Sequence, residues 1–484
     1  MSGAAHPIRP TLPPILAGIR PRPRMRELTL LVVVGAALII GSVSLGATQR
    51  LLDARREGGV PGPEAFAPAA VVPLAIYLGA LAAAHLAQVL AGRRTDQVLL
   101  PAMGLLGGIS LLLMQRLPQD LAGQLGGLGQ TQLVWLLISV GILTTLAIAV
   151  RSDGWLRMYK YTWAAVGIAL LLLTFVFGRE VNGSRLTLDL GPVSGQPSEL
   201  LKVILVVFLA GYLSENRALL VEQYWRVGPL RLPPVQYLLP MIAMWAIALG
   251  IVVVQRDLGA ALLFFVVFLV LLYVATARWT YVVWGLVLFV VGAWVMYQLF
   301  GHVRTRVDIW IDPFADPRGA GYQVVQALYA FARGGMLGTG LGGGLPIVGG
   351  RLPIPEIHTD FPLAALGEEL GLIGILAILG LYLVVIQRGL RIAASAADDF
   401  RALLATGLAL VVGVQAFIIA GGNLKLVPLT GITLPFISYG GSSLLANGVV
   451  IGLLLALSDK GVEPPPPPRP PGRRLARWVD RGAR

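Results

Sequence analysis

Apolar segments long enough to cross a bilayer recur along this chain of 484 residues. About 20 mostly apolar residues let a helix span the hydrocarbon core of a membrane. A backbone in lipid must also satisfy its own hydrogen bonds, which favours helices. The sequence therefore predicts an all-α polytopic membrane protein with about 12 transmembrane helices. They are expected near residues 28–48, 67–91, 97–115, 132–150, 158–177, 198–214, 235–254, 259–276, 280–300, 363–387, 402–420 and 440–457.

The composition excludes several classes of protein. Only 13% of the residues are charged, whereas soluble domains contain about 25%, and 56% are hydrophobic. A soluble multidomain enzyme, a disordered chain and a fibrous repeat are excluded on these figures. The absence of cysteine excludes disulfides, thiolate catalysis and cysteine-ligated metals.

The positive charges predict an orientation. With the N-terminus in the cytoplasm, 24 of the 38 Lys and Arg residues fall in inner segments and 13 in outer ones, five of these in one long outer loop. Positive residues in short loops favour the cytoplasmic side. Both termini are therefore expected inside. The net charge of +13 then reflects topology rather than nucleic-acid binding.

The same orientation predicts one long segment on the outer side of the membrane, at residues 301–362. The basic residues 1–27 are expected to lie against anionic lipid on the inner face. The tail 461–484 contains Pro464 to Pro468 followed by arginines, a pattern typical of an extended, disordered segment.

The outer segment gathers carboxylates and arginines around two Asp-Pro pairs. A residue before proline is pushed out of the helical region, so the aspartates could simply shape turns. Alternatively, a carboxylate beside a membrane surface can serve as a general base, and arginines suit a phosphate-bearing ligand. The residues alone leave both interpretations open. The residues concerned are Asp308, Asp312, Asp316, Arg304, Arg306, Arg318 and Arg333.

Ionisable residues within membrane spans are costly and therefore informative. Glu199 and Lys202 are three positions apart, so a helix places them on one face, as a structural ion pair or as part of a site. We expect His85 to make a polar packing contact and Asp257 to form a cap or a local salt bridge. The glycine-rich run 334–344 is expected to pack as irregular backbone against helices rather than to bind nucleotide.

Several motifs together resemble one known family. The segment Gln196-Pro-Ser-Glu199-Leu-Leu-Lys202, the turn Asp257-Leu-Gly259 and the segment Asp316-Pro-Arg-Gly-Ala-Gly-Tyr-Gln323 follow in its order. So do His358-Thr-Asp-Phe361, the Glu368-Glu369 pair that follows it, and Thr430 to Ser443. Over residues 96–460 the chain resembles the SEDS proteins (shape, elongation, division and sporulation). Arg256 stands where that family usually has proline, so a different turn is expected there.

The resemblance implies a ten-helix core related to the GT-C glycosyltransferases, with residues 28–95 forming two additional N-terminal helices. It implies a peptidoglycan glycosyltransferase that polymerises lipid II outside the bacterial plasma membrane, with Asp316 as the catalytic residue. It also implies a class B penicillin-binding protein (a transpeptidase) and other elongasome or divisome membrane proteins as partners. The expected substrate-binding residues are Arg304, Arg306, Arg318, Lys425, Glu199, Lys202, His358, Asp360, Ser442 and Ser443.

In the implied reaction, a sugar hydroxyl attacks the anomeric carbon of a second lipid-linked unit while Asp316 accepts its proton. No cofactor and no protein metal site are expected, although a divalent cation, Mg²⁺ or Mn²⁺, could assist the diphosphate. The alternative is a lipid II flippase, which twelve spans and buried charges would also suit. A pure scaffold would make no use of the carboxylates. Elongation, division and sporulation are not distinguished.

Overall fold

The computed structural model describes most of the chain between residues 22 and 459. The described ranges are 22–56, 67–121, 126–181, 184–189, 194–222, 225–227, 230–232, 255–344 and 354–459, with isolated residues between 239 and 253. Most of the expected span 235–254, the basic residues 1–21 and the tail 461–484 lie outside this part.

Ten helices of the described chain are long and apolar enough to cross a membrane. The expected all-α membrane fold is therefore confirmed, and each predicted span in the described ranges has its helix. A shorter apolar helix, α15, follows them. The elements are α1 (Met25–Arg56), α2 (Val71–Leu90), α3 (Leu99–Arg116), α4 (Leu128–Ala149), α6 (Lys160–Phe177), α7 (Pro197–Glu222), α9 (Leu258–Thr276), α10 (Trp279–Leu299), α13 (Pro362–Ala394), α14 (Asp399–Asn423) and α15 (Gly441–Leu457).

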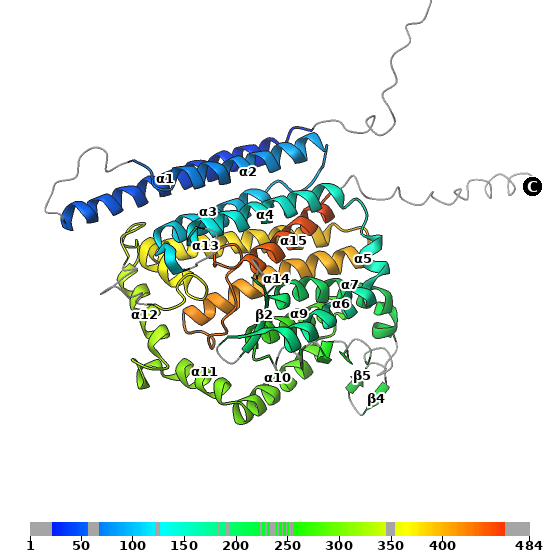
Figure 1. Ribbon diagram of the computed structural model, residues 1–484. Helices are drawn as coiled ribbons and strands as arrows, with labels where there is room; N and C mark the ends of the chain where they lie inside the picture. The colour runs from blue at the N-terminus through cyan, green and yellow to red at the C-terminus, as the bar shows by residue number, and fades with distance from the viewer. Residues whose placement is uncertain are drawn as a thin grey trace, which may run out of the picture.

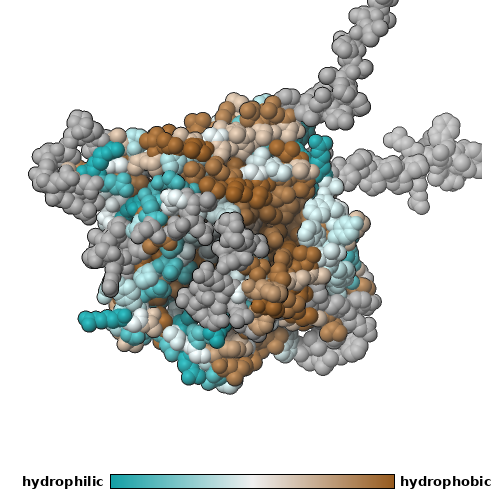
Figure 2. All heavy atoms as spheres, in the orientation of Figure 1, coloured by the Kyte–Doolittle hydropathy of each residue, from teal (hydrophilic) through white to brown (hydrophobic). Residues whose placement is uncertain are grey.

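The helices run side by side as a bundle (Figure 1). Helices α3, α7, α14 and α15 bury most of their residues and form its centre. Hydrophobic side chains form a band across the bundle, and hydrophilic residues gather toward both ends (Figure 2). This is the pattern expected when lipid surrounds the middle of the protein and water covers its ends.

Helices α1 and α2 lie along one side of the bundle, next to α3 and α4 (Figure 1). They pack through a small apolar cluster separate from the main core, comprising Val34, Leu38, Leu45, Leu74 and Leu112. The Leu38 side chain occupies space that a side chain at Gly108 would need, so the glycine lets α1 approach α3 closely.

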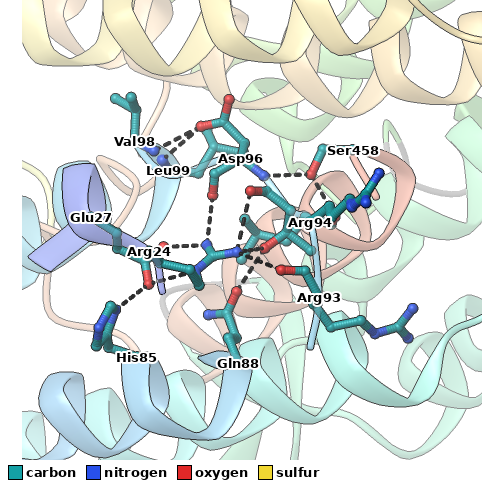
Figure 3. A network of polar contacts seen from close by, with 12 residues as sticks. Arg24, Glu27, His85, Gln88, Arg93, Arg94, Asp96, Val98, Leu99 and Ser458 are labelled. Atoms are coloured by element: carbon teal, nitrogen blue, oxygen red, sulfur yellow. Dashed lines mark hydrogen bonds and ion pairs between the residues drawn. The ribbon is translucent and has the colours of Figure 1, made fainter. Parts of the chain in front are cut away.

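A buried polar network joins this N-terminal pair to the bundle (Figure 3). The Arg24 side chain is only 3% exposed and donates hydrogen bonds to Glu27, to the Thr95 hydroxyl at 2.7 Å and to the Asp96 carbonyl at 3.1 Å. His85 contacts Glu27 through Nδ1 at 2.7 Å, which is the polar packing contact expected of it. Arg24 was expected at the lipid surface, and that prediction is wrong because these partners enclose it.

Both ends of the described chain lie at the same end of the bundle. Arg93 donates to Asp459 at 2.8 Å, and the Ser458 hydroxyl accepts the Asp96 N–H at 2.8 Å. Residues 93–96 therefore bind the end of α15 as well as Arg24.

Other charged residues at this end also join separate helices. Arg388 of α13 pairs with Asp96, and Arg401 of α14 binds Asp153 at 2.9 Å. Asp153 precedes the short helix α5 (Gly154–Met158). Several arginines that set the predicted orientation thus also hold helices together, and each partly buried carboxylate offsets the cost of enclosing its arginine.

The opposite end of the bundle carries residues 301–344 and 354–362 of the long segment, where the structure forms helices α11 (Gly301–Ile311) and α12 (Tyr322–Gly334), with the short 3₁₀ helix η3 (Pro313–Ala315) between them. Another 3₁₀ turn, η2, covers Gln119–Leu121. Short antiparallel ladders occupy two other connections. They are β1 (Arg179–Val181), β2 (Ser184–Asp189) and β3 (Ser194–Gly195), and β4 (Trp225–Val227) with β5 (Leu230–Leu232).

Candidate functional site

The first turn of α7 carries a buried ion pair. Lys202 Nζ donates to Glu199 Oε2 at 2.6 Å, to Gln415 Oε1 at 2.8 Å and to Asn447 Oδ1 at 3.2 Å. An ammonium group has three protons to donate, and these contacts use all of them. The side chain of Lys202 is 2% exposed, so its charge depends on these partners from α14 and α15.

Hydroxyl groups complete the surroundings of this pair. Thr433 donates to Glu199 Oε1 at 3.3 Å and lies 2.6 Å from the Ser443 hydroxyl. Ser442 accepts the backbone N–H of Gln196 at 2.9 Å. The structure thus brings together four predicted site residues, Glu199, Lys202, Ser442 and Ser443.

Asp257 belongs to the same group, beyond its expected role as a cap. Its Oδ1 accepts the Ala260 N–H at 3.0 Å, which caps α9, while Oδ2 accepts from the Ser198 hydroxyl at 3.2 Å. Burial raises the pKa of the Asp257 carboxyl, and the bonds from Ala260 and Ser198 oppose that rise. We call Glu199, Lys202, Asp257, Thr433 and Ser443 the central polar cluster.

The turn before Asp257 contains a residue in the left-handed region. Arg256 adopts φ = 65°, a left-handed conformation that proline cannot take because its ring fixes φ near −65°. Arginine is therefore compatible with this turn and proline is not.

A small cavity of about 30 Å³ lies within the central polar cluster. Glu199, Lys202, Asp257 and Thr433 contribute to its walls, as does Gly431. This volume suits about one ordered water, since a single water needs at least 10–15 Å³ and several polar partners. The cluster can hold a water or relay a proton, but it cannot admit a sugar in this conformation.

Arg306 of α11 links the outer segment to this cluster. Its Nη1 donates to the carbonyls of Leu429 and Thr430, at 3.4 and 2.9 Å, just before cavity residue Gly431. Burial raises the pKa of both Asp257 and Asp360, and the charge of this same guanidinium opposes the rise at each carboxyl group. Arg306 was expected to bind substrate, and here it bonds to two backbone carbonyls and acts electrostatically on two carboxyl groups.

Asp360 lies beside Arg306 at the rim of the cavity. A methyl group placed on Gly431 would lie 3.8 Å from Asp360 Oδ2 and 3.9 Å from an Arg306 nitrogen. Burial and, less strongly, Glu356 raise the pKa of Asp360 to about 6, while Arg306 opposes the rise. The Asp360 carboxyl is therefore a weaker acid than an ordinary aspartate.

Three successive carbonyls fix the segment that carries Asp360. The carbonyl of His358 accepts from the Tyr439 N–H at 2.8 Å, that of Thr359 from the Ser438 hydroxyl at 2.6 Å, and that of Asp360 from Asn423 at 2.8 Å. Burial lowers the pKa of the His358 imidazole, and Glu356 opposes this. These bonds tie the His358-Thr-Asp360 motif to the segment that follows α14.

Asp316 is exposed and its carboxylate is held in a fixed turn. Oδ1 accepts the Gly319 N–H at 3.0 Å and Oδ2 accepts the Ala320 N–H at 2.9 Å. A side chain at position 319 would collide with this carboxylate, and one at 321 would collide with the Pro313 carbonyl. The Asp-Pro-Arg-Gly-Ala-Gly spacing therefore positions the Asp316 carboxylate as well as turning the chain.

Asp316 lines a second and larger cavity, which we call the outer cavity. Its volume is about 430 Å³ and its walls come from α11, η3 and the turn at Asp316. Asp308 and Asp312 also line it, so three carboxylates share this space. Glu199 and Lys202 do not line this cavity, so the predicted site residues divide between two places.

The remaining predicted cations lie around the outer segment. Arg304 is exposed and stacks on Tyr297 with its guanidinium carbon 5.5 Å from the ring centre. Arg318 is exposed two residues after Asp316. Lys425 is partly buried, and its carbonyl accepts from the Trp310 indole at 3.2 Å. Arg304 and Arg318 can therefore meet an anionic ligand.

The glycine-rich run packs against helices, as expected. The N–H groups of Thr339 and Gly340 donate to the carbonyls of Glu368 and Glu369, each at 3.0 Å. Arg333 binds Glu368 at 2.9 Å, and Arg116 pairs with Glu369. These buried glutamates bind α12, α3 and α13 together.

The described residues contain no group of three or more His, Asp or Glu side chains arranged to hold a metal ion. The two oxygens of Asp316 already accept backbone N–H groups. The donor set does not form a metal site, so we derive no step through a cation.

A family model for FtsW, RodA and SpoVE, described as cell cycle proteins, matches residues 96–462. The chain is 38% identical over 450 residues to the peptidoglycan glycosyltransferase RodA of Mycobacterium tuberculosis H37Rv, covering 92% of both chains. It is 36% identical over 328 residues to a probable peptidoglycan glycosyltransferase FtsW of Legionella pneumophila, covering 66% of this chain and 79% of that relative.

Solved structures share the fold. A chain of a peptidoglycan synthase complex that coordinates polymerization and crosslinking is similar with a TM-score of 0.59 and 28% identity, over 75% of this chain and 98% of that chain. The rod shape determining protein RodA of Thermus thermophilus has a TM-score of 0.51 and 25% identity, over 75% and 97%. With ten apolar helices in its described part, the chain is a multi-pass bacterial membrane protein, and it belongs to the FtsW/RodA/SpoVE family of cell cycle proteins.

Proposed function

We propose that this protein is a peptidoglycan glycosyltransferase that polymerises lipid II on the outer face of the plasma membrane. The observation that carries the proposal is the Asp316 carboxylate, which is exposed, fixed by two backbone N–H groups and directed to an open cavity of about 430 Å³. A cavity of this size lies in the range of small-molecule sites, about 300–1,000 Å³.

The reaction joins two lipid-linked disaccharide units. The 4-hydroxyl of one sugar attacks the anomeric carbon of the other, a new glycosidic bond forms, and the bond to the polyprenyl diphosphate breaks. Asp316 accepts the hydroxyl proton, which a poor nucleophile must lose as it attacks. A single displacement of this kind needs one protein base, unlike hydrolysis with its pair of carboxylates.

The leaving diphosphate gains negative charge and needs cations nearby. Arg304 and Arg318 meet this need because both are exposed on the segment that carries Asp316. Lys425 is a third candidate at the edge of that segment. Arg306 contributes indirectly, because its bonds to the carbonyls of Leu429 and Thr430 fix α11 over the central polar cluster.

The central polar cluster supports the reaction rather than performing it. Lys202 and Glu199 satisfy each other and their neighbours, and the cavity between them is too small for a sugar. They brace the first turn of α7 against α14 and α15. The cluster thereby holds the segment 429–433, to which Arg306 and the outer helix α11 attach.

A transpeptidase of the class B penicillin-binding type is the proposed partner. The related solved chain comes from a complex that coordinates polymerization and crosslinking, and crosslinking of new glycan is transpeptidase chemistry. Relatives named RodA match 80–92% of the chain and FtsW relatives 60–66%, which favours a role in cell shape. The orientation that the positive charges predict, with both termini inside, would put Asp316 on the outer side, where such a partner would act.

The test is glycan formation by the purified protein in liposomes that contain lipid II. Polymer chains should appear without any other enzyme. A flippase would move the lipid head group across the bilayer and form no polymer, so translocation without polymer would overturn the proposal. The observation that favours polymerisation over transport is the exposed carboxylate group of the outer cavity.

A further inference from the structure

A third cavity lies between the N-terminal helix α1 and the core, apart from both sites described above. Its volume is about 190 Å³. Alkyl side chains form nearly all of its wall, with Leu38 and Leu45 from α1, Leu112 from α3 and Leu341 from the glycine-rich run. Arg116 and Glu369 lie at its polar edge.

An apolar cavity of this size does not hold water well. A cavity of about 150 Å³ lined by aliphatic and aromatic side chains stays dry and binds small hydrocarbons. The wall here offers a water almost no hydrogen-bond partner away from Arg116 and Glu369. A hydrocarbon chain is therefore the occupant that its chemistry favours.

The cavity has an opening on the surface of α1. Ala37 lines it and is also exposed, whereas the next residue, Leu38, is 2% exposed. The exposed neighbours of Ala37 on this helix include Val33 and Ile40, which are apolar. The opening therefore faces the hydrocarbon of the bilayer.

Helix α1 is a fixed wall of this cavity. One end of α1 is held by the buried bonds of Arg24 to Glu27, Thr95 and Asp96 (Figure 3). Further along the helix, Gly342 packs beside Leu45 and Thr48. The cavity therefore lies between two anchored parts of α1, the Arg24 end and the contact with Gly342, and it is a permanent part of the fold.

The charges at the polar edge decide which lipid fits. Arg116 pairs with Glu369, and Arg333 pairs with Glu368, so two positive groups meet two negative ones. This balance gives no excess positive charge for the diphosphate of a prenyl-linked substrate, which carries several negative charges. A phospholipid can place an acyl chain here while its head group stays at the membrane surface.

We propose that this cavity binds one acyl chain of a membrane phospholipid, which seals the N-terminal helices against the core. The site is separate from Asp316 and is not occupied by the prenyl chain of the substrate.

The test uses photo-crosslinking of the full-length protein in vesicles of phosphatidylethanolamine and phosphatidylglycerol. A small fraction of the phosphatidylglycerol carries a diazirine within its acyl chain, and a parallel sample carries a diazirine-labelled polyprenyl diphosphate instead. The phospholipid probe should label peptides that contain residues 37–45 and 105–113. Ala37→Trp places a bulky ring in the opening, and overpacking of this kind should reduce that label by about tenfold.

Ala36→Trp is the matched control, because Ala36 is an exposed neighbour on the same helix that does not line the cavity. It should retain the label, and both variants should still polymerise lipid II. Equal labelling of the two variants, no label in these peptides, or labelling by the prenyl probe alone would overturn the proposal. Failure of polymerisation in the unaltered protein would instead count against the proposed function, because the crosslink does not depend on activity.

Discussion

Lys202 Nζ donates a hydrogen bond to Glu199 Oε2 at 2.6 Å, and the Lys202 side chain is only 2% exposed. The sequence predicted this contact, because residues three apart share one face of a helix. The partners from α14 and α15 were not predictable, since Gln415 and Asn447 lie 213 and 245 residues from Lys202. The buried pair has a measurable consequence for stability.

Lys202→Met should destabilise the protein strongly, because Glu199 would keep a buried charge without its partner. Breaking a buried pair in this way costs about 3–5 kcal/mol. Thermal unfolding in detergent micelles measures the loss. The double variant Glu199→Gln/Lys202→Met should be more stable than Lys202→Met alone, and a double variant that is less stable would show that the two side chains do not act as a pair.

Gly319→Ala should impair polymerisation without unfolding the protein, because the new methyl group would displace the Asp316 carboxylate. A misplacement of about 1 Å can cost about 100-fold in rate. Initial rates with lipid II test this. Gly301→Ala is the matched control, since a methyl group at that position of α11 meets nothing within 4 Å, and its rate should stay normal.

Arg306→Gln should move the acid limb of the rate profile to higher pH. The Arg306 charge opposes the rise of the Asp360 pKa, so its loss should lift that pKa above about 6. Less of the Asp360 carboxyl is then ionised at neutral pH. Polymerisation rates measured between pH 5 and 8 test this shift, because carboxyl groups with raised pKa values titrate in that range. An unchanged acid limb would contradict the link between the Arg306 charge and the Asp360 pKa.

Arg24→Met should loosen the N-terminal helices, because Glu27 would lose its buried partner. Hydrogen exchange along α1 and α2 should become faster, while exchange in α14 stays slow. Arg26→Met offers a control on the same turn, since Arg26 is exposed. Equal exchange in both variants would show that the Arg24 network does not anchor α1.

Local sequence patterns predicted where the helices lie, whereas contacts between residues far apart in the sequence could not be predicted. The spans followed from hydrophobicity alone, as α9 at Leu258–Thr276 shows against the expected 259–276. The irregular packing of the glycine-rich run was also expected. Arg93 illustrates the limit, since its charge suggested only topology, yet it binds Asp459, 366 residues away. Pairings of that kind depend on the tertiary arrangement of the helices.

The same contrast between local sequence patterns and long-range contacts applies to the functional site. The motif around Asp316 indicated that this residue is important. Its hydrogen bonds to backbone N–H groups and its position in the wall of the outer cavity became visible only in the folded structure. The sequence predicts a cap or a local salt bridge at Asp257, and the second bond of this side chain, to Ser198, makes it part of the central polar cluster. The signal that could have revealed this role was the family motif at Asp257-Leu-Gly259, because a cap alone does not require that motif.

The proposed base is tested most directly by glycan formation from lipid II with purified Asp316→Asn, compared with Asp312→Asn. Both residues line the outer cavity, so the two variants alter the same space. A general base contributes about 100- to 10,000-fold to a rate. We predict that Asp316→Asn inserts and folds normally but makes no detectable polymer, while Asp312→Asn remains active. Full polymerisation by Asp316→Asn would contradict the account.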